Sequence, residues 1–147
     1  MPKLRTFSAL LVTDGGKSPM VGSAGNSKPR VLLVEDEALV ALMIQETLTE
    51  LDYQVIGPLN TASEALAAAR ANHFDAAVLD INLGDGLVYT VAEILSVRGV
   101  PFVFVTGYDA DSVDPRFSDV PILQKPIERD VLQRVFMSGL LHRAAVA

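Results

Sequence analysis

Polar side chains follow four short apolar runs of the chain, at the points where buried strands would end. The residues at these points are Glu35 with Asp36, Asp80, Thr106, and Lys125. Mg²⁺ prefers oxygen ligands and is commonly held by one or two carboxylates together with phosphate oxygens. A carboxylate beside such an ion can act as a nucleophile and form an aspartyl-phosphate. If the four run ends meet, the chain has the groups for Mg²⁺-dependent phosphoryl transfer to a carboxylate.

The acidic residues divide into metal ligands and a nucleophile. We expect Asp36 and Asp80 to bind Mg²⁺ directly, and Glu35 to act through water or as a nearby charge. The backbone carbonyl of Asn82, two residues past Asp80, is well placed to complete the ligand set. Because the cation offsets the repulsion among the carboxylates, Asp80 can remain ionised as the phosphoacceptor. We also expect its carboxylate to be accessible to solvent.

Lys125 and Thr106 are suited to contacts with the phosphoryl group. Phosphoryl transfer has a loose transition state, so a protein mainly positions groups and stabilises charge on the equatorial oxygens. Lys125 supplies a compact positive charge and should pair with Asp80 before phosphorylation. Thr106 can donate a hydrogen bond from its hydroxyl group, and Gly107 leaves the approach open.

Each of these residues also has a simpler explanation when it is taken alone. An acidic pair after a strand often marks a helix N-terminus, where carboxylates favour the helix dipole. Asp80 could be a turn residue, and Lys125 a solvated charge. Four apolar runs that are followed, in this order, by an acidic pair, an aspartate, a threonine and a lysine are hard to explain by helix capping alone. The combination, and not any single residue, therefore supports the phosphoryl-transfer hypothesis.

The elements that position these residues follow an alternating pattern from Arg30 onward. Apolar runs alternate with amphipathic stretches, which predicts βαβ units and a parallel sheet, and ligands bind at the carboxyl edge of such a sheet. The predicted strands are Val31–Val34, Tyr53–Ile56, Ala76–Leu79, Phe102–Val105 and Ile122–Gln124. The predicted helices are Ala38–Leu51, with a buried stripe at Val40, Ile44, Leu48 and Leu51, then Thr61–Ala71, Leu87–Arg98 and Glu128–Leu141, with only a short or irregular helix near Pro115–Ser118.

Composition and charge place the chain among ordinary globular domains. Its 147 residues are 50% hydrophobic and carry a net charge of −6, so we expect no direct nucleic-acid binding, which needs a basic face. No apolar stretch is long enough to span a membrane, and the absence of cysteine fits the cytoplasm. Residues 1–29 are rich in loop formers and are predicted to be a disordered extension, which leaves residues 30–147 as the domain.

The chain resembles the receiver domains of two-component response regulators between Pro29 and Leu141. The stretches that carry the resemblance are Val34-Glu35-Asp36-Glu37, Leu79-Asp80-Ile81-Asn82-Leu83, Val105-Thr106-Gly107 and Gln124-Lys125-Pro126. The resemblance implies an α/β fold, a single flavodoxin-like (βα)5 doubly wound domain with a five-stranded parallel sheet of order 2-1-3-4-5. It also implies that Asp80 is the phosphoacceptor, with Mg²⁺ as the cofactor.

The same resemblance implies the remaining roles and the partners. Glu35 and Asp36 would be the metal-binding acids, and Thr106 and Lys125 the pair that signals phosphorylation. The donor would be a phosphohistidine on a histidine kinase or a histidine phosphotransfer protein, and the phosphoryl group would be lost by slow self-catalysed hydrolysis. We therefore predict a stand-alone, single-domain response regulator that signals by protein contact or serves as a phosphorelay shuttle or sink, and that is not an enzyme.

A narrower likeness concerns the fourth predicted strand and the residues after it. Pro101–Tyr108 resembles a subgroup of alphaproteobacterial receivers with a Phe-Ala-Thr-Gly-Tyr-like signature, although Val105 stands in place of its alanine. Receivers usually carry an aromatic residue where this chain has Ile122. Tyr108 either replaces that aromatic residue in the switch or simply covers the rim of the core.

Three other functions remain as alternatives. A haloacid-dehalogenase-like phosphatase would use Asp80 as nucleophile, but it needs an acid two residues later, where this chain has Asn82. A flavodoxin-like small-molecule binder lacks a strong phosphate-cradling loop and any tryptophan to stack on a flavin. A receiver-like interaction module that is never phosphorylated would not need the full residue set.

Two apolar groups outside the predicted core are candidates for partner contacts. Residues off the buried stripe of the first helix could form a docking face for the phosphodonor: Leu39, Leu42 and Met43. Residues of the last helix could mediate a homodimer or close the core: Phe136, Leu140 and Leu141.

Overall fold

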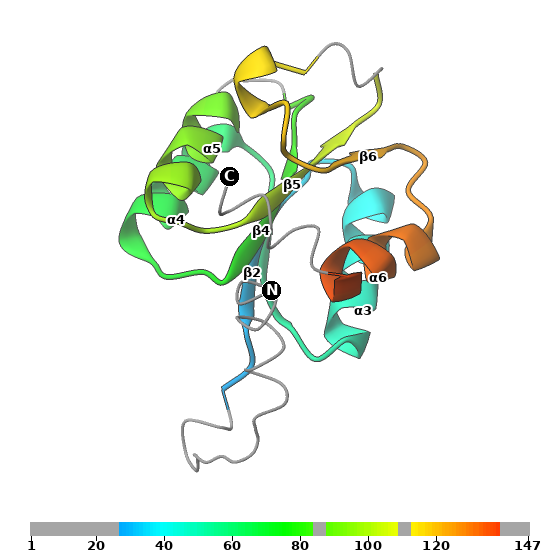
Figure 1. Ribbon diagram of the computed structural model, residues 1–147. Coiled ribbons are helices and arrows are strands. Elements are labelled where there is room, and N and C mark those ends of the chain that lie inside the picture. Colours follow the sequence, from blue (N-terminus) through cyan, green and yellow to red (C-terminus); the bar gives the residue numbers. More distant parts are fainter. Residues whose placement is uncertain (1–26, 84–87, 109–112, 139–147) are drawn as a thin grey trace.

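The described residues, 27–83, 88–108 and 113–138 of a computed structural model, alternate between strands and helices (Figure 1). The strands are β2 (Arg30–Val34), β3 (Gln54–Leu59), β4 (Ala76–Asp80), β5 (Phe102–Thr106) and β6 (Ile122–Gln124). The helices are α3 (Ala38–Glu50), α4 (Ala62–Ala71), α5 (Val88–Val97) and α6 (Arg129–Ser138), with a single 3₁₀ turn, η2 (Pro115–Phe117), between β5 and β6. The short or irregular helix expected near Pro115–Ser118 is thus confirmed.

The five strands are parallel and lie in the order β3-β2-β4-β5-β6, which confirms the predicted 2-1-3-4-5 sheet. Helices α4 and α5 cover one face of the sheet, and α3 and α6 cover the other (Figure 1). Because the sheet is buried on both faces, its central strands are apolar almost throughout. The chain order reverses between β2 and β4, and the crevice outside their carboxyl ends is the expected ligand site.

Strand β3 is longer than predicted, because it continues through Gly57 and Pro58 to Leu59. The prediction that it stops before Gly57 was wrong because β3 is an edge strand, where a proline without an N–H is tolerated. Its register with β2 shifts at this point, and Gly57 has φ +120°. A Cβ atom there would lie 2.5 Å from the carbonyl oxygen of Leu33. Only glycine therefore fits this irregularity.

Helix α3 packs on the sheet by a slightly different face from the predicted one. Ile44 and Leu48 are buried as expected, but Val40 and Leu51 are only half-buried. Thr47 is fully buried, and its hydroxyl donates to the carbonyl oxygen four residues earlier at 2.8 Å. A pattern of apolar letters misses Thr47 because the helix itself satisfies its polar group.

Two helix ends are capped by residues that commonly start or stop helices. The Thr61 hydroxyl accepts a hydrogen bond from the Glu64 N–H at 3.1 Å, and the Glu64 carboxylate accepts from the Asn60 N–H at 3.1 Å. These bonds satisfy donors at the start of α4 that have no partner inside the helix. Gly99, with φ +73°, follows α5 as a left-handed C-terminal residue.

Some predictions fall outside the described residues. These are the extension up to residue 26, the start of the third predicted helix at Leu87, and the last helix beyond residue 138, with Leu140 and Leu141. Phe136 is described, and it is buried edge-to-face against Tyr53, so it closes the core. Within the described ranges, no helix has the length and apolar character needed to cross a bilayer.

Candidate functional site

Three carboxylates meet at the carboxyl edge of the sheet. Glu35 and Asp36 directly follow β2, and Asp80 is the last residue of β4, the parallel neighbour of β2. One carboxylate oxygen of each residue lies within 4.8 Å of the others. Asp36 is exposed, whereas Glu35 and Asp80 are each 1% exposed. The convergence expected from the strand ends is therefore present, but the expectation that Asp80 is open to solvent was wrong.

The donor set fits a hard divalent cation. Among the described residues, the buried Oε1 atom of Glu35 has no hydrogen-bond partner, which is costly for an ionised group. Burial raises the pKa of Glu35 to about 7, and the negative charge of Asp80 adds to this effect. A cation among the three acids would supply the missing partner. Clustered carboxylate oxygens with one exposed member, Asp36, match the ligand preference of Mg²⁺.

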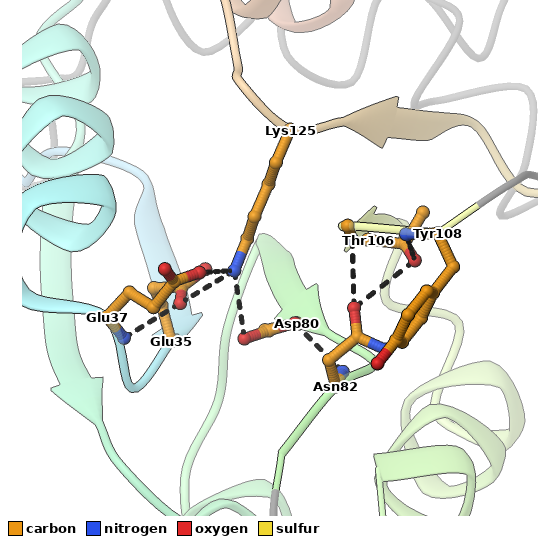
Figure 2. A network of polar contacts seen from close by, with 8 residues as sticks. Glu35, Glu37, Asp80, Asn82, Thr106, Tyr108 and Lys125 are labelled. Carbon is orange, nitrogen blue, oxygen red and sulfur yellow. Dashed lines mark hydrogen bonds and ion pairs between the residues drawn. The ribbon is translucent and has the colours of Figure 1, made fainter.

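Lys125 lies across the acids as their counter-charge (Figure 2). Its Nζ atom is 3.2 Å from Glu35 Oε2 and 3.4 Å from Asp80 Oδ2, and it also forms an ion pair with Glu37. Burial alone would lower the pKa of Lys125, but the hydrogen bond to Glu37 and the charges of Asp80 and Glu35 outweigh this and raise it. The Lys125–Asp80 pairing expected from the sequence is present.

Glu37 is a part of the site that the sequence did not predict. Its carboxylate pairs with Lys125, and its backbone N–H donates to Glu35 Oε2 at 2.9 Å. The only signal was a third acid directly after the acidic pair. With a side chain 59% exposed, Glu37 could equally have pointed into water.

Thr106 lies on the other side of Asp80 and is fully buried. Its Oγ1 atom donates to the side-chain oxygen of Asn82 at 3.2 Å and accepts from the Tyr108 N–H at 2.9 Å. The Gly107 N–H also donates to that Asn82 oxygen at 2.9 Å, and the Asn82 N–H donates to Asp80 Oδ1 at 2.9 Å (Figure 2). The sequence pointed to the carbonyl of Asn82 and missed its side chain, whose partners lie 24 and 25 positions further along the chain.

The position of the missing aromatic residue is filled by aliphatic packing. Ile122 pairs with Phe104 across β5 and β6 and is half-buried against the apolar cluster that contains Phe117. The aromatic rings on this side of the sheet pack mostly edge-to-face against one another, and Tyr89 stacks on Phe117 at 5.7 Å between centroids. Tyr108 is 65% exposed and joins none of these ring contacts among the described residues.

A groove of about 460 Å³ opens beside the acids, between α3 and the end of β3. Its lining combines acidic, apolar and amide side chains: Glu35, Asp36, Ala38, Ala41, Leu42, Gln45, Pro58 and Asn60. Leu42 is 49% exposed, and its neighbour Leu39 is 82% exposed. Of the docking face expected on α3, Leu39 and Leu42 are therefore exposed and Leu42 lines the groove, whereas Met43 is half-buried and packs against the core.

Comparisons with known proteins match this fold. The family model for the response regulator receiver domain matches residues 31–136. The transcriptional regulatory protein PdtaR of Mycobacterium tuberculosis is 32% identical over 92 residues, 61% of this chain and 44% of the relative. The phyllosphere-induced regulator PhyR of Methylorubrum extorquens is 32% identical over 101 residues, 67% of this chain and 36% of the relative. The chain thus spans less than half the length of these two relatives.

Solved structures show the same architecture. SdrG from Sphingomonas melonis Fr1 is 40% identical, with a TM-score of 0.65 over 82% of this chain and 98% of that chain. PhyR from Brucella abortus is 26% identical, with a TM-score of 0.65 over 81% of this chain and 50% of that chain. A CheY-like receiver domain from Methanospirillum hungatei JF-1 is 25% identical, with a TM-score of 0.69 over 82% of this chain and all of that chain, 100%.

Proposed function

The chain belongs to the response regulator receiver family, and from this premise we propose that it is a phosphorylated signalling switch and not a small-molecule enzyme. Asp80 accepts a phosphoryl group from a phosphohistidine on a histidine kinase or a histidine phosphotransfer protein. The phosphorylated form then signals by protein contact or passes the group along a phosphorelay. The observation that carries this proposal is the clustering of the Asp80 carboxylate with Glu35, Asp36 and the Lys125 ammonium.

The residues around Asp80 have distinct tasks in the transfer. A carboxylate oxygen of Asp80 attacks phosphorus, the N–P bond of the phosphohistidine breaks, and the imidazole keeps the electron pair. Lys125 stabilises negative charge on the transferred group, and Thr106 donates its hydroxyl hydrogen bond to a phosphoryl oxygen. Attack of water on the acyl phosphate later returns Asp80 and inorganic phosphate.

Glu35, Asp36, Asp80 and the backbone carbonyl of Asn82 would hold the cation. When bound, Mg²⁺ neutralises charge on the phosphoryl oxygens and on the carboxylates. The unpartnered Oε1 atom of Glu35 and the exposed carboxylate of Asp36 support this assignment. The Lys125 Nζ atom lies 3.4 Å from Asp80 Oδ2, which places its charge within reach of a phosphoryl group on this carboxylate.

The groove beside α3 is the proposed docking place of the phosphodonor. It adjoins Glu35 and Asp36, so a partner seated there brings its imidazole close to Asp80. The exposed Leu39 and Leu42 supply apolar contact area next to the acids. A helical partner with an apolar face and a protruding histidine fits this combination.

The decisive experiment measures transfer of radioactive phosphate in the presence of Mg²⁺. Acetyl phosphate or a phosphorylated kinase should label the wild-type chain, and Asp80→Asn should abolish the label because the amide is not a nucleophile. Asp52→Asn makes the same change at an exposed residue before β3, at the opposite edge of the sheet, and should label normally. Persistent Mg²⁺-dependent labelling of Asp80→Asn would refute the proposed phosphoacceptor.

A further inference from the structure

Asn82 is the residue that connects the phosphoacceptor to the signalling hydroxyl (Figure 2). Its backbone N–H donates to Asp80 Oδ1 at 2.9 Å. Its side-chain oxygen accepts from Thr106 Oγ1 at 3.2 Å and from the Gly107 N–H at 2.9 Å. Asn82, which lies two positions after the last residue of β4, is therefore hydrogen-bonded both to the end of β4 and to the end of β5.

The hydroxyl of Thr106 has a single proton to donate. That proton is directed to Asn82, and the hydroxyl oxygen already accepts from the Tyr108 N–H at 2.9 Å. Thr106 is 0% exposed, so these contacts take place away from bulk water. The hydroxyl cannot donate to a phosphoryl group on Asp80 while it donates to Asn82.

From this competition we infer that the side chain of Asn82 is a positioning residue that holds Thr106 in the unphosphorylated arrangement. The inference rests on the proposed function and deepens it. A charged phosphoryl oxygen is a stronger acceptor than a neutral amide. On phosphorylation, the Thr106 hydroxyl therefore donates its hydrogen bond to the phosphoryl group instead of to Asn82. The Asn82 side chain thus determines the fraction of unphosphorylated molecules in which the Thr106 hydroxyl no longer donates to Asn82.

The side chain of Asn82 can be removed without removing its other contacts. Asn82→Ala keeps the backbone N–H that donates to Asp80 and the backbone carbonyl that is the proposed metal ligand. It deletes the side-chain amide, including the oxygen that accepts from Thr106 and from the Gly107 N–H. A neutral hydrogen bond of this kind shifts an equilibrium about three- to tenfold.

The test uses the full chain with saturating Mg²⁺ and beryllofluoride, a stable mimic of the phosphoryl group. Titrations followed through the amide NMR signals of Thr106 and Gly107 should show Asn82→Ala binding beryllofluoride about three- to tenfold tighter than wild type. Without beryllofluoride, the Thr106 signal of the variant should already lie part of the way toward its activated position. Asn82→Leu removes the same oxygen at similar volume and should act alike.

Two controls separate this role from a structural one. Asn72→Ala makes the same change at the C-terminal cap of α4 and should leave both readouts unchanged. Asn82→Asp keeps an acceptor oxygen and should leave the Thr106 signal near its wild-type position. A site that is merely loosened would bind beryllofluoride more weakly, which is the opposite sign.

Unchanged or weaker binding by Asn82→Ala and Asn82→Leu would overturn the inference, as would a Thr106 signal that moves equally in Asn82→Asp. These results would leave the proposed function standing, provided that the wild-type chain binds the mimic and Asp80→Asn does not. If the wild-type chain fails to bind beryllofluoride at Asp80, the proposed function fails and this inference fails with it.

Discussion

The two sides of Asp80 are built from different interactions. On one side, the buried Glu35 and Asp80 share the charge of Lys125. On the other side, neutral hydrogen bonds join Thr106, Asn82 and the Gly107 backbone. We call these the charged side and the neutral side. The charged side holds the groups proposed for the metal and the transfer, and the neutral side holds the group proposed to report it.

The difference has an energetic meaning. Buried charges interact strongly in a medium of low polarity, and the loss of one partner leaves another charge without compensation. Neutral hydrogen bonds contribute about 1 kcal/mol each and can be exchanged for one another at little cost. The charged side should therefore dominate stability and its dependence on pH and Mg²⁺, while the neutral side should be easy to switch.

The largest effect is expected from Lys125→Met. The substitution leaves Glu35 and Asp80 buried without their counter-charge, so the free energy of unfolding without Mg²⁺ at pH 8 should fall by about 3 to 5 kcal/mol. Urea denaturation measures this. Lys28→Met removes an exposed pair with Asp52 and should cost less than about 1 kcal/mol. Equal losses in the two variants would abolish the distinction between buried and exposed pairs.

The next effect is the pH dependence contributed by Glu35. Its pKa is raised from 4.5 to about 7 in the folded chain, so between these values the unfolded chain gives up the proton first. The contribution of Glu35 to the free energy of unfolding of the metal-free protein should be fully present below pH 4.5. It should fall by about 3 kcal/mol as the pH rises through 7. Denaturation at several pH values measures this decline.

Two comparisons isolate the contribution of Glu35 to that decline. Glu35→Gln cannot ionise, so its curve should lack this component, and the difference between the two proteins gives the size of the effect. Saturating Mg²⁺ should flatten the wild-type curve because the cation stabilises the ionised carboxylate. Superimposable curves for wild type and Glu35→Gln would contradict the prediction.

A smaller effect concerns access to the charged side through the groove. Leu42→Asp should slow phosphotransfer from the partner protein about tenfold, because it places a charge in an apolar contact. Labelling by acetyl phosphate, which needs no docking, should be unchanged. Val97→Asp makes a similar change at an exposed residue of α5, on the opposite face of the sheet, and should transfer normally. A rate with the protein donor equal to wild type would remove the groove from the docking surface.

The smallest effect is expected on the neutral side. Thr106→Val removes the hydroxyl but fills the same volume, so the free energy of unfolding should change by only about 1 kcal/mol. Phosphorylation of Asp80 should persist, while the Gly107 amide signal should no longer follow it. A loss as large as that of Lys125→Met would show that both sides carry the stability of the site.

Sequence reasoning was most successful where one physical cause dominates. Strands buried on both faces must be apolar, so β4 and β5 were recognised from their letters, and the family assignment and the likeness to alphaproteobacterial receivers are confirmed. Because parallel strands end at one edge, the meeting of Glu35, Asp36 and Asp80 could be predicted without coordinates. The regular pattern of the sheet made this part of the site predictable.

It was least successful where a side-chain conformation or an edge position decides. Glu37 reaches Lys125 across 88 positions of the chain, and the Asn82 amide turns toward Thr106; neither contact leaves a trace in residue spacing. The burial of Asp80 was also missed, because residue spacing does not show which side chains pack around the end of a strand. These contacts depend on the packing of the whole molecule.

The irregular passage of β3 through Gly57 and Pro58 has a consequence beyond the edge of the sheet. The strand ends at Leu59, whose carbonyl oxygen accepts the backbone N–H of Glu35 at 3.0 Å. The first acid of the site is thus tethered to the outermost strand. A side chain in the place of Gly57 would push against the β2 backbone at Leu33, two residues before that acid. A substitution outside the site would thus displace Glu35 and lower the affinity for the metal.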